Sequence, residues 1–253
     1  MARTILIASG KGGTGKTTLA SNLAYSLAEV NQRVFVIDAN LTTPNLGIHL
    51  GFHLVPITLH DILKGKYELR KAIYYHPSGM RVIPGSLKTE DLIGIEPSSL
   101  TEVVLTLLPE ADFIILDGAA GLGRETIAGL NACDEVILIS NPSLPSVIDG
   151  LKLIKVAESL NKKVLGVVVN RISKKNSLSK EKIEEILGQK IIAEIPEDPK
   201  IPLSISYKKP LLEFDPYSPA ALEIRKLGYS LVGKEFKYPR KSLFKVLISK
   251  IFG

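Results

Sequence analysis

A glycine-rich stretch with two lysines and three threonines is the feature of this sequence that most directly indicates chemistry. Residues 10–18 read GKGGTGKTT and fit the pattern G-x-x-x-x-G-K-[ST], between a short apolar run and a segment rich in Ala and Leu. Glycines let the backbone turn its N–H groups onto phosphate oxygens, and the N-terminus of a following helix adds a favourable dipole. A lysine at this place neutralises the outer phosphates, and the hydroxyl that follows it can bind Mg²⁺. The stretch therefore predicts a phosphate-binding loop. The residues expected to contact the nucleotide there are Gly12, Gly13, Thr14, Gly15, Lys16, Thr17 and Thr18.

Short runs rich in β-branched residues, with helical segments between them, indicate the scaffold of this loop. The predicted strands are 4–8, 33–37, 81–83, 112–116, 135–139, 163–169 and 190–195. They are nearly all apolar rather than alternating, which is typical of strands that are covered on both faces. Ser218 followed by Pro219 predicts the start of a helix over 220–236. We expect an α/β fold: a single-domain P-loop NTPase with a mostly parallel central sheet and helices on both faces, followed by an amphipathic tail.

Composition limits the class of protein. Of the 253 residues, 45% are hydrophobic and 23% charged, which fits an ordinary globular chain, and we expect one domain over residues 1–236. Cys133 is the single cysteine, which excludes a disulfide framework and any iron–sulfur site that needs several thiolates from one chain. We find no export signal and no run near the roughly 20 apolar residues of a membrane-spanning helix. The expected location is the cytoplasm, with any membrane contact peripheral.

Most of the net positive charge lies at the C-terminal end. The formal charge is +6, from 32 Lys and Arg against 26 Asp and Glu; residues 234–253 hold six basic and one acidic side chain, which gives +5 of it. Within the predicted tail, 237–253, apolar residues follow helical spacing. They are Leu243, Phe244, Leu247, Ile248 and Ile251. A basic amphipathic helix is typical of a segment that lies in a membrane interface, and a terminal helix docked on its own domain is the alternative.

Lys11 places a second lysine early in the loop, where it cannot easily share the phosphate side of Lys16 and can reach towards another subunit. With this lysine, the loop resembles the deviant Walker A motif of the ParA/MinD family of P-loop ATPases. The resemblance covers almost the whole chain. It includes segments 36–38, 45–47, 113–121, 140–142, 169–171 and 195–198. It implies ATP and Mg²⁺ as cofactors, hydrolysis of ATP with Lys11 and Lys16 in the catalytic set, and a homodimer on ATP in which Lys11 contacts the partner's nucleotide.

The resemblance also implies roles for polar residues that follow the strands. Asp117 and Asp38 end neighbouring strands at the carboxyl edge of the sheet, where carboxylates can hold Mg²⁺ together with Thr17. Residues 118–124 have the composition of a mobile switch that senses the terminal phosphate. Asp149, near the start of a predicted helix over 147–160, resembles an acidic residue at the family's dimer and partner face; a plain helix-start carboxylate is the alternative. The expected base-binding residues are Asn170, whose amide would read the adenine edge, Arg171, Pro196, Glu197 and Asp198.

One position departs from the family pattern. Its first switch normally reads Asp-x-Asp, with the second aspartate linked to the attacking water, whereas this chain has Asp38-Ala39-Asn40. An amide cannot take a proton, but its oxygen accepts a hydrogen bond from water. Phosphoryl transfer depends chiefly on positioning and charge neutralisation. With Asp38 and Asn40 in the catalytic set, we expect hydrolysis that is slow rather than absent.

Three functions follow as hypotheses. The first is a MinD-like ATPase that cycles between cytoplasm and membrane and positions or regulates an unidentified protein partner, at the division site or in flagellar placement. The second is a ParA-like ATPase that binds DNA through Lys162, Lys163, Lys174 and Lys175; the near-neutral body and apolar tail make nucleic acid the less favoured partner. The third, suggested by Asn40, is a nucleotide-gated scaffold that hardly hydrolyses.

Overall fold

An eight-stranded sheet forms the centre of the protein. The computed structural model describes residues 2–173 and 178–238. The strand order is β3-β4-β2-β5-β1-β6-β7-β8, and every neighbouring pair is parallel except β3 with β4. The strands are β1 Arg3–Ser9, β2 Val34–Ala39, β3 Tyr74–Tyr75, β4 Arg81–Ile83, β5 Phe113–Ala120, β6 Glu135–Ser140, β7 Lys163–Ile172 and β8 Ile191–Pro196. This architecture confirms the predicted α/β fold with a mostly parallel sheet.

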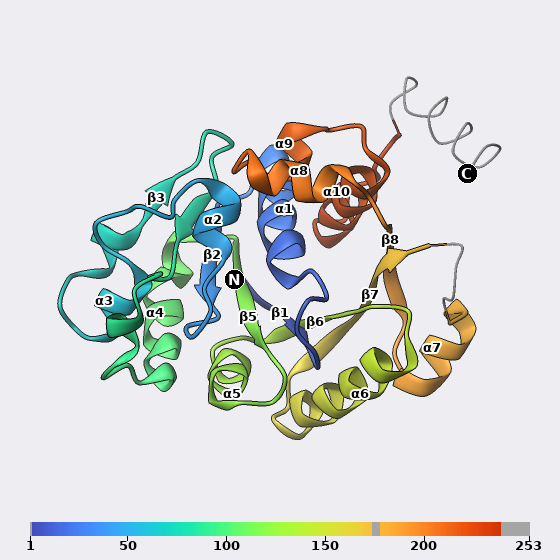
Figure 1. Ribbon diagram of the computed structural model, residues 1–253, viewed down its shortest axis with the longest axis horizontal. Helices are drawn as coiled ribbons and strands as arrows, with labels where there is room; N and C mark the ends of the chain where they lie inside the picture. The colour runs from blue at the N-terminus through green and yellow to red at the C-terminus, as the bar shows by residue number, and fades with distance from the viewer. Residues whose placement is uncertain (1, 174–177, 239–253) are drawn as a thin grey trace.

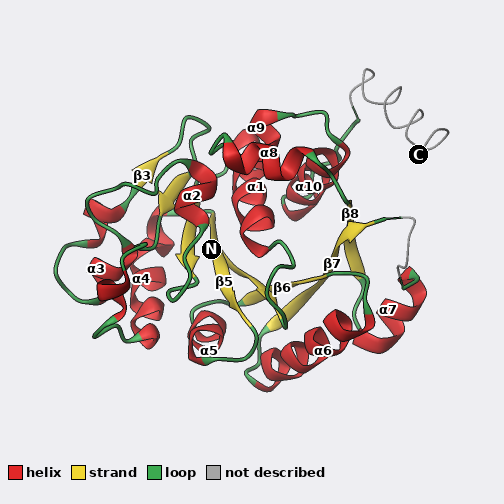
Figure 2. Ribbon diagram, viewed as in Figure 1, coloured by secondary structure: helices red, strands yellow, loops and turns green. Residues whose placement is uncertain are grey.

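Helices cover both faces of the sheet (Figures 1 and 2). The helices are α1 Lys16–Glu29, α2 Leu46–Leu50, α3 Leu59–Leu63, α4 Leu100–Leu107, α5 Arg124–Asn131, α6 Leu144–Ser159, α7 Lys180–Leu187, α8 Lys200–Ser206, α9 Leu211–Phe214 and α10 Pro219–Leu231. One buried apolar cluster packs the helices α3, α4, α5, α6 and α7 against one face of the sheet. A second cluster joins α1, α2, α9 and α10 to the other face. The strands between the two clusters are buried on both sides, which explains their continuous apolar runs.

Several element boundaries differ from the sequence predictions. β2 and β5 continue beyond their predicted ends, because Asp38 pairs with Asp117 and Ala39 with Gly118 in the parallel ladder. The short edge strand β3, which is antiparallel to β4, was not predicted. The predicted helix over 220–236 ends at Leu231, and Gly233 then takes a left-handed φ of 68°.

The chain after α10 folds back onto that helix. The ring of Phe236 lies between those of Tyr229 and Tyr238, with centroid distances of 5.2 Å and 5.3 Å. The Tyr238 hydroxyl donates to Glu223 over 2.7 Å. The predicted tail lies outside the described residues from residue 239 onward, so its helix and the domain boundary at 236 remain predictions. Among the helices that the structure describes, none combines the length and apolar character needed to cross a membrane.

Candidate functional site

The predicted phosphate loop connects the carboxyl end of β1 to the first residue of α1 (Figure 1). Gly13 and Gly15 have φ values of 75° and 100°, and residues other than glycine rarely adopt this region of backbone conformation. A β-carbon on Gly15 would also lie 2.3 Å from Nδ2 of Asn170. The glycines therefore allow the tight turn that places this loop directly at the N-terminus of α1. Backbone N–H groups at a helix N-terminus are a common binding site for anions.

Lys16 points back into the loop rather than towards solvent. Its side chain is buried, and Nζ donates to the Ser9 hydroxyl over 2.9 Å. That hydroxyl in turn donates to the carbonyl oxygen of Lys11 over 2.7 Å. Burial lowers the pKa of Lys16, and the negative charge of Asp117 opposes this shift. Ser9 was not predicted as a site residue, although its place at the end of the strand that leads into the loop could have indicated it.

Asp38 and Asp117 lie opposite each other in the β2–β5 ladder and are both fully or almost fully buried. Oδ2 of Asp38 accepts the N–H of Leu46 over 2.9 Å. Among the described residues, Oδ1 of Asp38 and both carboxylate oxygens of Asp117 have no hydrogen-bond partner. Burial raises the pKa of both groups; the proximity of Asp117 adds to the rise at Asp38, while the Thr17 side chain and Lys16 oppose it at Asp117. Two adjacent carboxylates with unpaired oxygens form an environment that favours a cation.

The fit of Mg²⁺ to this place can be tested on the residues present. Mg²⁺ is usually held by one or two carboxylates, a hydroxyl and the phosphates of a substrate, rather than by a cage of protein ligands. Asp38, Asp117 and Thr17 supply such a set, whereas the described residues contain no group of three or more His, Cys, Asp or Glu side chains that could hold a metal. The unpaired oxygens thus agree with a metal that is bound together with a nucleotide.

Asn40 uses its amide within its own loop. Its Nδ2 donates to the carbonyl oxygen of Thr43 over 2.6 Å, and its Oδ1 accepts the Thr43 hydroxyl over 3.1 Å. The neighbouring Thr42 donates its backbone N–H to Glu125, in the first turn of α5, over 3.1 Å. The loop after β2 is therefore bonded both to itself and to the helix that follows β5.

The segment predicted as a mobile switch, 118–124, is partly regular structure. Gly118 to Ala120 belong to β5, and the turn is confined to 121–123 before α5 begins. A β-carbon on Gly118 would lie 2.7 Å from the carbonyl oxygen of Ile7, so this glycine permits close approach of β1 rather than motion. Gly121, with φ of 78°, donates its N–H to the Ser9 carbonyl and brings the turn beside the phosphate loop.

A cavity of about 200 Å³ lies beside the start of α1. It is lined by Gly15, Thr18, Asn170, Arg171, Glu197, Asp198, Ile201, Pro202 and Ile205. Four of the five predicted base-binding residues are among these, and Pro196, the last residue of β8, is not. The three apolar residues from α8 were not predicted. An apolar wall in a cavity that a phosphate loop and an asparagine also line suits the face of a planar base.

Two of the predicted base-binding residues have structural contacts of their own. Nδ2 of Asn170 donates to the Thr14 carbonyl over 2.7 Å. The buried carboxylate of Asp198 accepts the N–H groups of Lys200 and Ala220, over 2.9 Å and 3.3 Å, and so joins the starts of α8 and α10. The side chain of Asp198 therefore has a structural role: it holds together the elements that form the cavity wall.

Asp149 lies in the second turn of α6, with its backbone against Gly10. Its carboxylate pairs with Lys152 over 3.1 Å. The helix begins at Leu144, three residues before its predicted start. This residue is consequently beside the phosphate loop, although its side chain is bonded along its own helix.

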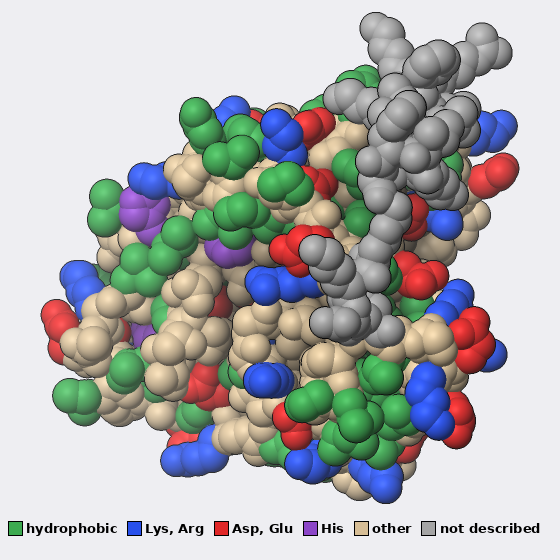
Figure 3. Space-filling model, turned by 45° about the vertical axis from the view of Figure 1, so that its right-hand side comes forward, with side chains coloured by type: hydrophobic (Ala, Val, Ile, Leu, Met, Phe, Trp, Pro, Cys, Tyr) green, Lys and Arg blue, Asp and Glu red, His purple; other side chains and the backbone are tan. Residues whose placement is uncertain are grey.

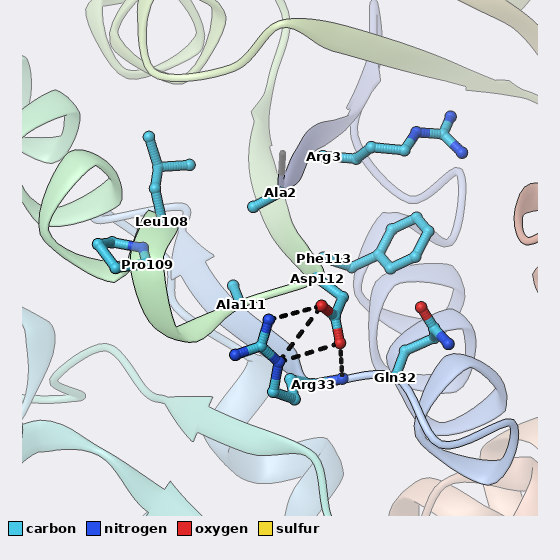
Figure 4. Close-up of a pocket in the computed structure, with 9 residues that line it drawn as sticks. All are labelled: Ala2, Arg3, Gln32, Arg33, Leu108, Pro109, Ala111, Asp112 and Phe113. Carbon is cyan, nitrogen blue, oxygen red and sulfur yellow. Dashed lines mark hydrogen bonds and ion pairs between the residues drawn. The ribbon is translucent and has the colours of Figure 1, made fainter.

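A larger cavity, of about 430 Å³, lies at the opposite edge of the sheet, where β1 and β5 begin (Figure 4). The guanidinium group of Arg33 binds both oxygens of Asp112, with Nη2 to Oδ1 at 2.7 Å. Arg3 pairs with Glu135 over 2.7 Å and lies 5.3 Å from the centre of the Phe113 ring. Because both cationic groups are already paired, we assign no ligand to this cavity.

Comparison with known proteins agrees with this geometry. The model of the CobQ/CobB/MinD/ParA nucleotide binding domain matches residues 5–211, a range that runs from β1 to α9. An ATP-binding protein of Methanocaldococcus jannaschii is 37% identical over 258 aligned positions, which cover 100% of this chain and 98% of that protein.

Solved structures show the same similarity. The septum site-determining protein MinD of Pyrococcus horikoshii, complexed with Mg-ADP, has a TM-score of 0.88 and 34% identity, covering 91% of this chain and 96% of that one. A chain of the MinC:MinD cell division protein complex of Aquifex aeolicus has a TM-score of 0.83 and 28% identity, covering 94% and 99%.

The extent of these matches confirms the resemblance that Lys11 and the segments after the strands indicate. The family match includes the phosphate loop, both aspartates and Asn170. This chain therefore belongs to the family of CobQ/CobB/MinD/ParA nucleotide-binding domains, as a MinD-like P-loop protein whose cofactors are ATP and Mg²⁺.

Proposed function

We propose that this protein is an ATPase that dimerises on ATP and cycles between the cytoplasm and the membrane surface to position or regulate a protein partner. The observation that carries the proposal is the arrangement around the loop. Lys16 is buried and close enough to Asp117 for their charges to interact, whereas Lys11, five residues earlier, is exposed. One lysine is thus available to the bound nucleotide, and the other to a nucleotide on a second subunit.

The surroundings of Lys11 favour a second copy of the chain as the occupant of this face. Three large apolar side chains are exposed on the elements that flank the loop: Leu122 (41% exposed), Leu144 (53%) and Ile148 (39%). Covering them on ATP binding would add apolar burial to the charge interaction between Lys11 and the partner's phosphates. ATP, with its additional phosphate, would then hold the dimer more strongly than ADP.

Hydrolysis is proposed to be slow because of Asn40. Its amide is bonded to Thr43 and has no carboxylate with which to accept a proton. Lys16, together with a Mg²⁺ ion that the two aspartates would hold, still supplies charge neutralisation, which with positioning makes up most of phosphoryl-transfer catalysis. We expect a turnover below about 1 per second. A chain that binds ATP without measurable turnover would instead be the nucleotide-gated scaffold.

Membrane attachment is proposed to depend on two tails acting together. Ordering one short helix costs backbone entropy. Burial of its apolar side chains and attraction to anionic lipid nearly cancel this cost, so a single tail should bind the membrane only weakly. A dimer makes insertion of the second tail intramolecular, which can raise avidity by roughly 10² to 10⁴. The nucleotide state would in this way determine whether the protein is in the cytoplasm or on the cytoplasmic face of the membrane.

The protein partner is proposed by similarity. A structure of a MinC:MinD cell division protein complex exists for Aquifex aeolicus, and by this similarity we expect a regulatory protein partner or activator here. Division-site and flagellar placement both fit such a cycle.

Nucleic acid is less well supported as a partner. Lys162 donates to the Cys133 carbonyl over 2.8 Å, and Lys163 pairs with Glu135 over 3.2 Å. The other two lysines considered, Lys174 and Lys175, lie outside the described residues. On the face of the molecule that Figure 3 shows, basic side chains are interspersed with acidic ones rather than gathered into a stripe. A DNA-binding surface normally concentrates positive charge on one face.

The test is sedimentation with anionic phospholipid vesicles in ATP, ADP or no nucleotide, with DNA retention measured in the same buffers. We expect vesicle binding with ATP and Mg²⁺ only, and no salt-dependent DNA retention. Equal vesicle binding of the ADP monomer and the ATP dimer would contradict the two-tail mechanism.

Two variants separate the tail from the dimer. Deleting residues 240–253, or changing both Phe244 and Ile248 to Glu, should abolish vesicle binding while light scattering still detects the ATP dimer. Vesicle binding that survives the deletion would remove the tail from the proposed function.

A further inference from the structure

His60, on α3, is a buried histidine whose two ring nitrogens contact two different loops. Its exposed fraction is 0%. Nε2 lies 3.0 Å from the carbonyl oxygen of Leu41, in the loop after β2. Nδ1 lies 3.0 Å from the backbone nitrogen of Ser86, in the loop after β4. One imidazole thus joins two segments that are far apart in the sequence.

These contacts determine where the ring proton is. The backbone N–H of Ser86 can only donate, so Nδ1 accepts, and the proton must be on Nε2 and donate to the Leu41 carbonyl. Burial lowers the pKa of His60; the Leu41 carbonyl, Asp91 and Asp61 oppose this shift, and Lys64 adds to it. The neutral ring therefore supplies one donor and one acceptor, and both are used.

The two loops also pack directly against each other. A β-carbon on Gly85 would lie 2.5 Å from Cβ of Pro44, so the loops approach as closely as a glycine allows. Two residues after Pro44, Leu46 donates its N–H to Oδ2 of Asp38 over 2.9 Å. The loop that His60 holds is consequently the loop that orients the Asp38 carboxylate.

We propose that His60 is a positioning residue, which fixes the loop 40–46 through Leu41 and so sets the place of the Asp38 carboxylate and the Asn40 amide. This inference rests on the proposed function, since that function gives Asp38 a role in binding Mg²⁺ with ATP and Asn40 a role in hydrolysis. His60 itself contacts neither the phosphate loop nor Asp117 through any hydrogen bond that the described residues form. Its effect must therefore pass through Leu41.

Two amide substitutions separate the contacts of the ring. Asparagine places its carbonyl oxygen near the position of Nδ1, so His60→Asn keeps an acceptor for Ser86 and loses the donor to Leu41. Glutamine reaches the position of Nε2, so His60→Gln keeps a donor to Leu41 and loses the acceptor. The two variants lose one buried hydrogen bond each and differ in which loop is released.

The readout is titration of a fluorescent ATP analogue at increasing Mg²⁺, with urea unfolding to compare stabilities. Without Mg²⁺, we expect the wild type and both variants to bind the analogue equally. The Mg²⁺ concentration that gives half of the maximal increase in analogue binding should rise about tenfold in His60→Asn. A change of this size is typical when a group that orients a metal ligand is lost. In His60→Gln it should stay near the wild-type value.

His76 provides the matched control. It is also buried, with Nδ1 bonded to the N–H of Ser78 over 3.1 Å and Nε2 3.5 Å from Glu213, and it faces the other side of the sheet. His76→Gln should lower stability without changing the Mg²⁺ requirement. The positioning role is overturned if His60→Asn and His60→Gln need equal Mg²⁺, or if His76→Gln shows the same increase. A wild type that binds no ATP analogue would instead overturn the proposed function, before any variant is compared.

Discussion

Gly10 and Asp149 approach so closely that the phosphate loop and α6 are in backbone contact. A β-carbon on Gly10 would lie 2.2 Å from the carbonyl carbon of Asp149 and 2.3 Å from its oxygen. Both are backbone atoms of a helix, so they cannot rotate aside as a side chain can. The first glycine of the motif is therefore required by packing, whereas Gly13 and Gly15 are required by their positive φ angles.

Substitution at Gly10 should consequently separate the loop from α6. We expect Gly10→Ala to lower the free energy of unfolding by about 2 kcal/mol or more, as overpacking does, and to weaken nucleotide binding. Gly12→Ala is the matched control, because a β-carbon at that position would meet no atom within 4 Å. Urea unfolding without nucleotide measures the free energy of unfolding of both variants. Equal stability of the two variants would show that the loop can move away from α6 at little cost.

The two lysines of the loop should respond differently to substitution. Lys16→Ala is expected to abolish ATP binding, because it removes the cation that faces Asp117 and the outer phosphates. Lys11→Ala should keep much of the binding and lose the dimer, measured by light scattering with ATP and Mg²⁺. Lys190→Ala, which removes an exposed lysine paired with Glu184, serves as the control. A Lys11→Ala dimer as tight as that of the wild type would exclude the contact across subunits.

Asn40→Asp should raise the rate of ATP hydrolysis. An aspartate cannot donate to the Thr43 carbonyl, so the 2.6 Å contact that Asn40 makes would become repulsive and release the side chain from its loop. The carboxylate could then orient the attacking water, which is the role that the family resemblance implies for the second aspartate. Phosphate release under saturating ATP measures the rate. If a folded Asn40→Asp protein hydrolyses no faster, this position does not limit the chemistry.

Asp117 should make the nucleotide-free protein less stable as pH rises. Its pKa in the folded state is raised above the ordinary value of 3.8, chiefly by burial. The neutral form is thus favoured, so stability from this group is complete below about pH 4 and is lost as pH rises through the folded pKa. Asp117→Asn removes this dependence, and its unfolding free energy at pH 8 should exceed the wild-type value by about 1 kcal/mol or more.

The same variant should gain less from its cofactors. ATP with Mg²⁺ should raise the melting temperature of the wild type more than that of Asp117→Asn. Glu181→Gln, at an exposed carboxylate of α7, should match the wild type in both measurements. If the unfolding free energy of Asp117→Asn varied with pH in the same way as that of the wild type, ionisation of this carboxylate would not destabilise the nucleotide-free protein.

The sequence by itself determined the features that depend on neighbours along the chain. The loop over 10–18 requires particular residues at fixed spacing, and the start of α1 follows from it. Buried parallel strands require continuous apolar runs, so seven strands could be located and the α/β class predicted. The end of α10 was missed, because rings at 236 and 238 pack back onto the helix instead of extending it.

Only the tertiary structure decided which distant residues meet. Asn170 contacts the carbonyl of Thr14 across 156 positions of sequence, and the apolar residues of α8 reach the same cavity. His60 joins Leu41 to Ser86, a contact that no spacing in the sequence indicates. Local patterns specify backbone conformation within a few residues, whereas such contacts depend on the order of the strands in the sheet and on the close approach of loops at its edge. For that reason the phosphate loop was predicted from residue types, and the groups that hold its surroundings in place were not.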